Sequence, residues 1–188
     1  VREKIVDLVG GINDIKKGII RAVGNPRERI REDRLRLLRI FRFTARMNGR
    51  IDDETSTAIK DDNRLNGISP EDDVSQERIN VEFIGMLSWC KKNNKLKSWL
   101  YYMDLLKSYK MLDRMFPYVR IDIEYYNTMN EFIVFAKLFS KNEPDEDFYR
   151  KLIYDIRLNS NLSKTILFLL KIKKLFNYKD IEKVFNID

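Results

Sequence analysis

The chain has 188 residues and a formal net charge of +7, and 44% of its residues are hydrophobic, whereas glycine (7) and proline (4) are scarce. A chain of this length can bury roughly two-thirds of the surface that its unfolded form exposes, and its composition excludes linker-like, collagen-like and low-complexity classes. It holds no histidine and one cysteine, Cys90, which excludes histidine-based catalysis, an internal disulfide and a cysteine-based zinc cluster, and favours a cytoplasmic, reducing compartment.

The first 24 residues combine a short helical pattern with a short strand. Residues 12–17 have helical spacing, and residues 18–24 form a β-branched run bounded by glycines, which is typical of a strand. We expect this segment to be a small αβ remnant that precedes a helical body.

Residues 25–47 carry signals for helix. Asn25 is a good N-cap, Pro26 suits the first helical position, and Glu28 stands three residues after the cap, as in a capping box. The run to Met47 fits either one helix or a short turn followed by a long helix, and the Asn-Gly pair that follows ends it.

The remainder of the chain is predicted to be helical. Asp52 and Asp53 begin a helix to about residue 65, residues 69–74 form an acidic loop, and Ser75 begins a helix through about Lys92. Further helical patterns cover residues 95–109, 128–140, 146–158, 161–176 and 178–185. No strand-like alternation appears after residue 24, so the predicted fold class is mainly α. The longest apolar runs have five residues, far short of the ~20 that a membrane span needs, so we expect no membrane segment.

The positive charge is concentrated in the first quarter of the chain. Residues 1–50 carry 14 Lys and Arg against 6 Asp and Glu, and they include 11 of the 17 arginines, whereas the other residues carry 22 against 23. Guanidinium groups suit phosphates and base edges, so this enrichment favours nucleotide or RNA contact. The alternative is a solvated helix face with many ion pairs.

Asp33 and Arg36 form a pair that can select a base. Adenine and cytosine present an amine donor beside a ring-nitrogen acceptor, whereas guanine and uracil present a carbonyl acceptor beside an N–H donor. A carboxylate next to a guanidinium matches the first pattern, which predicts selection of ATP and CTP. The alternative is an ordinary ion pair within a helix. If residues 25–47 form one helix, a single face carries Arg29, Glu32, Asp33, Arg36, Arg39, Phe43 and Arg46.

Three motifs occur in a defined order along the chain. The first has the pattern acid-x-x-Gly-Gly-x-x-Asp, the second is Glu-Asp-x-x-Arg, and the third covers residues 74–82. The residues of the first are Asp7, Gly10, Gly11 and Asp14, and those of the second are Glu32, Asp33 and Arg36. In this order they resemble the hinge motif, the nucleotide-selecting motif and a body helix of the class II tRNA nucleotidyltransferases, which are the CCA-adding enzymes and bacterial poly(A) polymerases.

The resemblance implies a protein template for the incoming nucleotide. Asp33 and Arg36 would pair with the base, and Glu32 would orient Arg36. Two roles stay open for Arg39, which either meets the triphosphate or braces Asp33. Three further arginines are candidates for phosphate or RNA contact, namely Arg29, Arg42 and Arg46.

The resemblance also implies three parts. Residues 1–24 would be the end of a catalytic head with its hinge, residues 25–93 a neck with the nucleotide-selecting helix, and residues 94–188 a helical body that binds RNA. The expected partners are therefore a nucleoside triphosphate and a tRNA or another RNA 3′ end.

The catalytic head of that family is absent from this chain. It holds a phosphate-binding Gly-Ser motif and an Asp-x-Asp pair for two Mg²⁺ ions, neither of which is found here. Because phosphoryl transfer needs metal-held carboxylates, we expect no catalytic residue, no metal site and no activity of this chain alone. The head, with its Mg²⁺, would belong to the same parent chain or to a separate polypeptide.

Several alternatives stay open at this point. The sequence leaves CCA addition and poly(A) addition undecided. A non-catalytic RNA- or protein-binding module derived from the same scaffold is the second hypothesis, and a purely structural helical adaptor is the third.

Overall fold

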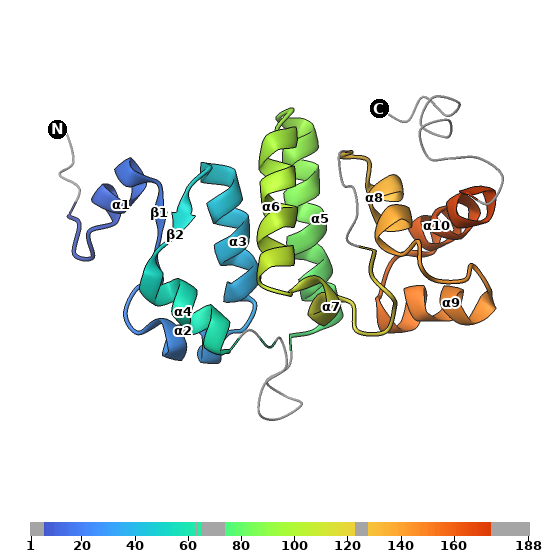
Figure 1. Ribbon diagram of the computed structural model, residues 1–188, viewed down its shortest axis with the longest axis horizontal. Coiled ribbons are helices and arrows are strands. Elements are labelled where there is room, and N and C mark those ends of the chain that lie inside the picture. Colours follow the sequence, from blue (N-terminus) through green and yellow to red (C-terminus); the bar gives the residue numbers. More distant parts are fainter. Residues whose placement is uncertain (1–5, 63, 65–73, 123–127, 174–188) are drawn as a thin grey trace. The chain divides into compact units, whose positions relative to one another are not determined.

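The computed structural model describes residues 6–62, 64, 74–122 and 128–173, and it divides the chain into two compact units, residues 1–74 and 75–188 (Figure 1). The described residues are mainly helical, with one small sheet, so the predicted fold class is confirmed. The division into head remnant, neck and body concerns function and stays a prediction.

The first unit contains four helices and one pair of short strands in its described part. In chain order these are α1 (Gly11–Lys17), β1 (Ile19–Ile20), α2 (Pro26–Glu32), α3 (Arg36–Met47), β2 (Arg50–Ile51) and α4 (Asp53–Asp61). The helices α1 and α2, with β1 between them, occupy the segments that the sequence predicts, and Asn25 caps α2 by accepting from the N–H groups of Arg27 and Glu28.

The strands β1 and β2 pair in parallel, with Ile19 opposite Arg50 and Ile20 opposite Ile51. No strand is expected after residue 24, so β2 corrects this expectation. A two-residue strand has no alternation to detect, and this one exists because β1 offers it hydrogen-bond partners. The N–H of Arg50 donates to the Gly18 carbonyl at 2.7 Å, and the N–H of Asp52 donates to the Ile20 carbonyl at 3.0 Å.

Helix α3 ends at an Asn-Gly pair, as predicted. Asn48 has φ 49°, the left-handed conformation that terminates many helices. Gly49 then passes against the backbone of Gly18. A Cβ at position 49 would overlap the Gly18 carbonyl oxygen and lie 3.0 Å from its carbonyl carbon, so only glycine allows β1 and β2 to approach as they do.

Helix α4 is shorter than expected. It begins after Asp52, whose side chain caps it, but it ends at Asp61 and not near residue 65. Asp62 leaves the helical conformation, with φ −143° and ψ 87°, and its carboxylate pairs with two arginines described below. The expected acidic loop lies outside the described residues except for Val74.

The second unit is helical throughout its described part. It contains α5 (Gln76–Lys92), α6 (Leu96–Ser108), α7 (Leu112–Met115), α8 (Glu131–Leu138), α9 (Glu146–Arg150), a π-helical turn (Lys151–Asp155) and α10 (Ser160–Lys173). Ser75 caps α5 as predicted. The helix expected over 146–158 is instead divided into α9 and the π-helical turn, and the short α7 is a finding of the structure. The helix expected over 178–185 lies outside the described residues.

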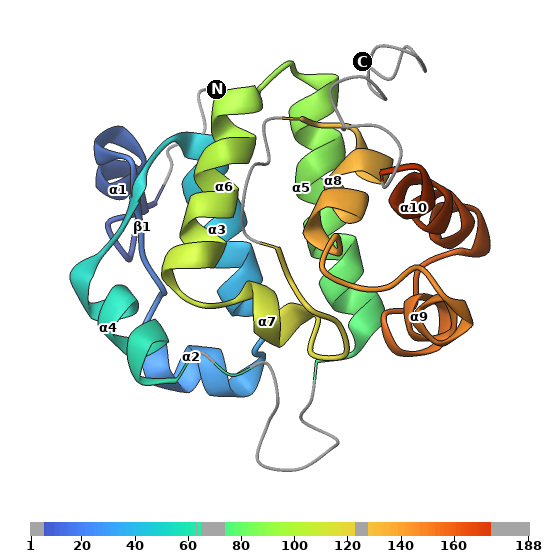
Figure 2. The ribbon, with the colours of Figure 1, turned by 45° about the vertical axis from the view of Figure 1, so that its right-hand side comes forward.

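Aromatic side chains form the core of the second unit. The rings of Phe83, Trp99, Phe116 and Phe135 are fully buried, and Phe83 lies 5.5 to 5.7 Å from each of the other three, measured between ring centroids. Helices α5 and α6 pack against each other, as do α8 and α10 (Figure 2). The side-chain amide of Asn80 on α5 donates to the Ile156 carbonyl at 2.6 Å, which ties α5 to the turn before α10.

Substitution of Gly49 tests the close approach of β1 and β2. We expect Gly49→Ala to lower the free energy of unfolding of the first unit by about 1–3 kcal/mol, because the backbone of Gly18 has to shift. Gly85→Ala is the matched control, since Gly85 is exposed within α5 and a Cβ there meets nothing within 4 Å. It should stabilise its unit by roughly 0.5–1 kcal/mol. Urea unfolding followed by circular dichroism measures both, and an unchanged Gly49→Ala protein would contradict the steric argument.

Candidate functional site

The predicted hinge residues lie together at the start of α1. One carboxylate oxygen of Asp7 accepts from the N–H of Gly11 and the other from the N–H of Ile12, both at 2.9 Å. Gly10 adopts φ 75°, which a glycine accepts without strain. The Ile12 and Gly11 N–H groups hold the pKa of Asp7 below its usual value. The acid and the two glycines of the motif therefore form one N-terminal cap.

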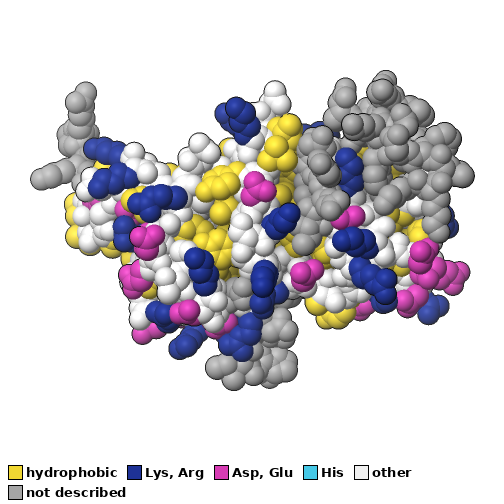
Figure 3. Space-filling view, in the orientation of Figure 1, with side chains coloured by type: hydrophobic (Ala, Val, Ile, Leu, Met, Phe, Trp, Pro, Cys, Tyr) yellow, Lys and Arg dark blue, Asp and Glu magenta, His cyan; other side chains and the backbone are white. Residues whose placement is uncertain are grey.

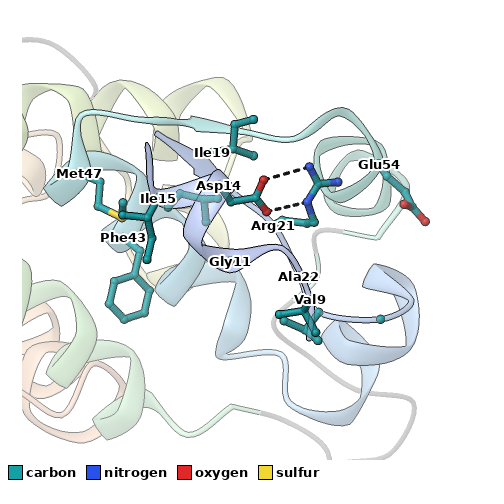
Figure 4. A pocket seen from close by; sticks show the side chains of 13 residues that line it. Val9, Gly11, Asp14, Ile15, Ile19, Arg21, Ala22, Phe43, Met47 and Glu54 are labelled. Atoms are coloured by element: carbon teal, nitrogen blue, oxygen red, sulfur yellow. Dashed lines mark hydrogen bonds and ion pairs between the residues drawn. The ribbon is translucent and has the colours of Figure 1, made fainter. Parts of the chain in front are cut away.

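Asp14, the last of the predicted hinge residues, binds Arg21. The Arg21 Nε lies 2.8 Å from Asp14 Oδ2 and its Nη2 lies 3.3 Å from Oδ1, a two-point contact that Figure 4 shows as dashed lines. The hydrogen bond from Arg21 lowers the pKa of Asp14. Arg21 Nη1 also lies 3.7 Å from the buried Asp52, the cap of α4. Arg21 thus connects α1 with α4.

A turn at Asp33 separates α2 from α3. Asp33 has φ −152° and ψ 102°, and its carboxylate accepts from the N–H of Leu35 at 3.1 Å. Its main-chain carbonyl accepts from the N–H of Arg36 at 3.0 Å. The structure has a short helix, α2, then a break at Asp33 and the longer helix α3, which is nearer to the second expectation than to one continuous helix. The single charged face that is expected if residues 25–47 form one helix is not formed, because the helix axis is interrupted between Glu32 and Arg36.

The turn is anchored by Arg34. Its side chain is only 3% exposed, so its charge needs a partner. Arg34 Nη1 lies 3.1 Å from Asp62 Oδ1 and 3.3 Å from the Arg64 carbonyl oxygen. The hydrogen bond from the Arg64 guanidinium, together with Arg34, lowers the pKa of Asp62 to about 2. The segment that carries Asp33 and Arg36 is thereby fixed to the C-terminal end of α4.

Glu32 joins two arginines across this turn. Its Oε1 lies 2.8 Å from Arg29 Nη2, and its Oε2 lies 2.7 Å from Arg36 Nη1. The same Nη1 donates to the main-chain carbonyl of Arg29 at 2.6 Å. The structure therefore brings Glu32 and Arg36 into direct contact, the relation that the resemblance implies.

A pocket of about 480 Å³ opens beside these residues. It is lined by four arginines and six apolar or small residues, and no carboxylate is part of the lining. The lining consists of Ile20, Arg21, Ala22, Val23, Arg29, Ile30, Arg36, Arg39, Ile40 and Phe43. Phe43 is 40% exposed. Guanidinium groups beside apolar walls and an accessible aromatic ring suit a ligand that combines negative charge with a flat ring.

A second pocket of about 340 Å³ adjoins the first and shares Phe43 and residues 20–23 with it. Figure 4 shows its apolar end, formed by Ile15, Phe43 and Met47, and its polar end with Asp14 and Arg21. On the face of the first unit that Figure 3 presents, Lys and Arg side chains lie beside hydrophobic ones. Gly11 and Asp14 of the first motif and Arg36 of the second line these adjoining pockets, whereas Glu32 and Asp33 line neither.

The other predicted residues divide into two groups. Arg29, Arg36 and Arg39 line the larger pocket, and Gly11 and Asp14 line the smaller one. Arg42 and Arg46 are also on α3 but line neither pocket, and the Arg42 guanidinium lies 4.8 Å from the centroid of the Phe43 ring. The sequence analysis did not select Arg21, which lines both pockets. Its position directly after a strand in an arginine-rich segment is the signal that could have identified it.

The described part of the chain holds no group of three or more Cys, Asp or Glu side chains placed to bind a metal ion. In the same residues, no helix is both long and apolar enough to span a bilayer.

Comparison with known proteins identifies related sequences. No protein-family model matches the chain. It is 29% identical to a CCA-adding enzyme of Leuconostoc mesenteroides over 87% of this chain and 39% of that enzyme. It is 43% identical to a CCA-adding enzyme of Ligilactobacillus salivarius over 45% of this chain and 20% of that enzyme, and 51% identical to a poly(A) polymerase I of Salmonella typhi over 28% of this chain and 11% of that polymerase. The chain thus spans well under half the length of the curated relatives that it matches.

The anchor of the Asp33 turn predicts an acid-sensitive stability. The folded pKa of Asp62 lies near 2, below its unfolded value near 3.8, so the carboxylate stabilises the fold above about pH 4 and this stabilisation is lost as the pH falls towards 2. Asp62→Asn should cost roughly 1–2 kcal/mol at pH 7 and flatten the decline. Asp61→Asn is the control, because Asp61 pairs with Arg27 at the exposed surface and should change stability by less than about 0.5 kcal/mol. Equal pH profiles of the two variants in urea unfolding would contradict this assignment.

Proposed function

We propose that this chain, a sequence relative of the CCA-adding enzymes and bacterial poly(A) polymerases, is the nucleotide-selecting and RNA-binding part of a template-independent RNA 3′-end nucleotidyltransferase. The arginine-lined pocket next to the Asp33 turn is the observation that carries the proposal. The roles proposed for the residues are the same for CCA addition and for poly(A) addition.

Base selection is assigned to Asp33 and Arg36. A main-chain hydrogen bond of 3.0 Å joins these residues, so their side chains start from one turn. Arg36 uses Nη1 for Glu32 and the Arg29 carbonyl, and among the described residues its Nε and Nη2 have no hydrogen-bond partner. These N–H groups can donate to the ring nitrogen of adenine or cytosine while the Asp33 carboxylate accepts from the exocyclic amine. Guanine and uracil would oppose donor to donor and acceptor to acceptor.

The triphosphate is assigned to Arg39, one of the arginines that line the pocket. Arg39 lines it one helical turn after Arg36 and forms no ion pair with a described residue. This position supports a contact with the triphosphate over the alternative role of bracing Asp33. Mg²⁺ would complete the neutralisation of the phosphates in the intact enzyme, held by carboxylates of the head.

A catalytic head is the second partner that we propose, either on the same parent chain or on a separate polypeptide. Support comes from apolar side chains that lie exposed around α1 and β1. Those more than half exposed are Val6, Leu8, Val9, Ile15 and Val23. Exposed apolar side chains grouped in this way are typical of an interface. Without the head, the chain is expected to be catalytically inactive.

RNA binding by the body is assigned to the tip between α5 and α6. Lys91, Lys92, Lys95 and Lys97 are exposed there, within seven residues that contain no acid, and none of them pairs with a described carboxylate. Lysines without carboxylate partners attract the phosphate backbone and release its counterions.

A cytoplasmic location suits such a protein, and Cys90 is buried with no second cysteine to oxidise against.

Nucleotide titration of the 188-residue chain tests base selection. We expect ATP and CTP to bind about tenfold more tightly than GTP and UTP, because each mismatch leaves polar groups unpaired. Arg36→Ala and Asp33→Ala should abolish this preference and leave the helical circular dichroism unchanged. Arg27→Ala is the control, since Arg27 pairs with Asp61 and does not line the pocket. Equal affinity of the unaltered chain for all four nucleotides would favour the second hypothesis, a non-catalytic RNA- or protein-binding module.

A salt series tests the lysine tip. We expect the affinity for a single-stranded RNA to fall with salt, and the double variant Lys92→Ala/Lys95→Ala should reduce the slope of log Kd against log salt by about 1.4, or about 0.7 for each lost phosphate contact. Lys107→Ala/Lys110→Ala removes the same charge from the other end of α6 and serves as the control. If the two double variants lower affinity equally, net charge and not this tip attracts the RNA.

A further inference from the structure

We propose that Arg29 is a positioning residue that sets the selectivity of the site by holding Arg36, and that it does not act as a phosphate ligand. The inference rests on the proposed function, because it concerns how Arg36 recognises a base. It follows from two hydrogen bonds and one ion pair that link Arg29, Glu32 and Arg36 across the interruption between α2 and α3.

The two N–H groups of Arg36 Nη1 have separate acceptors. One acceptor is Glu32 Oε2 at 2.7 Å, and the other is the main-chain carbonyl of Arg29 at 2.6 Å. Arg29 lies in the last turn of α2, so its carbonyl is close to the C-terminal end of that helix. Arg36 therefore caps α2 with its side chain, and in return the end of α2 fixes the plane of the guanidinium.

Arg29 also fixes the Glu32 carboxylate, which is the other acceptor of Arg36 Nη1. Its Nη2 binds Glu32 Oε1 at 2.8 Å, so the carboxylate has an arginine on each oxygen. Glu32 is 42% exposed and Arg36 38% exposed, so a single exposed ion pair would hold Arg36 only loosely. A carboxylate held from both sides has fewer rotamers, and it presents Oε2 to Arg36 in one position.

As a consequence, Nη1 of the Arg36 guanidinium is occupied by acceptors within the protein, whereas Nε and Nη2 are available to a base. Its Nε and Nη2 then point in one direction, whereas an unrestrained arginine could turn to donate to a guanine or uracil carbonyl. Selectivity against the wrong base requires the donor pattern to stay fixed, since a mobile side chain can adapt to either pattern. Loss of Arg29 should therefore increase tolerance for GTP more than it weakens ATP binding.

The two roles of Arg29 give different results in a nucleotide titration of the full chain. A positioning role predicts that Arg29→Ala lowers the ratio of ATP to GTP affinity by about fivefold, mainly through tighter GTP binding. Arg29→Lys keeps the positive charge but not the planar fork, and should lose most of the same ratio. Arg27→Ala on the same helix should leave the ratio unchanged. If Arg29→Ala weakens ATP and GTP equally, or if Arg29→Lys restores the unaltered ratio, Arg29 acts through its charge and the inference is wrong.

A nitrogen-15 NMR measurement of the Arg36 guanidinium tests whether Arg29 restrains Arg36, and it requires no nucleotide. In the unaltered chain, rotation that exchanges Nη1 and Nη2 should be slow, and Arg29→Ala should accelerate it several-fold, whereas Arg27→Ala should not. An unchanged rotation rate in Arg29→Ala would overturn the inference. If the unaltered chain binds all nucleotides equally, the proposed function fails, and this comparison alone decides whether Arg29 restrains Arg36.

Discussion

The interruption of the helix at Asp33 is the constraint on which the candidate site depends. In a continuous helix Arg36 would lie beside Glu32, four residues before it, on a single straight axis. Because the backbone leaves the helical conformation at Asp33, α3 starts in a new direction and the Arg36 side chain returns to the end of α2. Arg34, buried against Asp62, keeps that change of direction in place. One extended residue therefore decides which groups the arginine-rich segment can present.

Carboxylates organise the positive charge of the pocket. Asp14 holds Arg21, and Glu32 holds both Arg29 and Arg36, yet neither carboxylate lines the larger pocket. The guanidinium groups are thus fixed before a ligand arrives, which reduces the side-chain entropy that binding would otherwise cost. Arg39 alone among the four lining arginines has no ion pair with a described residue, so no described carboxylate competes with an incoming anion for it.

Local sequence signals predicted several of the helix starts. The Asn25-Pro26 pair and Ser75 mark helix starts because the capping side chain and the N–H groups that it satisfies are neighbours in the chain. Features formed by distant residues were not predictable in this way. Strand β2 exists only through its pairing with β1. Helix α4 ends early because the Asp62 carboxylate binds Arg34, which lies 28 residues before it in the chain. The motifs identified Glu32 and Arg36, but the contacts of Arg29 with both residues depend on the three-dimensional turn.

The pairing of β1 with β2 bears on how the protein can be divided for experiments. Residues 24 and 25 form a natural cutting point by motif, since the strand ends before them and a capped helix begins after them. A fragment that starts at residue 25 would nevertheless leave Arg50 and Asp52 without the Gly18 and Ile20 carbonyls to which their N–H groups donate. It would also remove Arg21 from beside the buried Asp52 carboxylate. A shortened version that keeps α4 intact has to begin before β1. The two-residue strand therefore decides how much of the N-terminal segment can be removed.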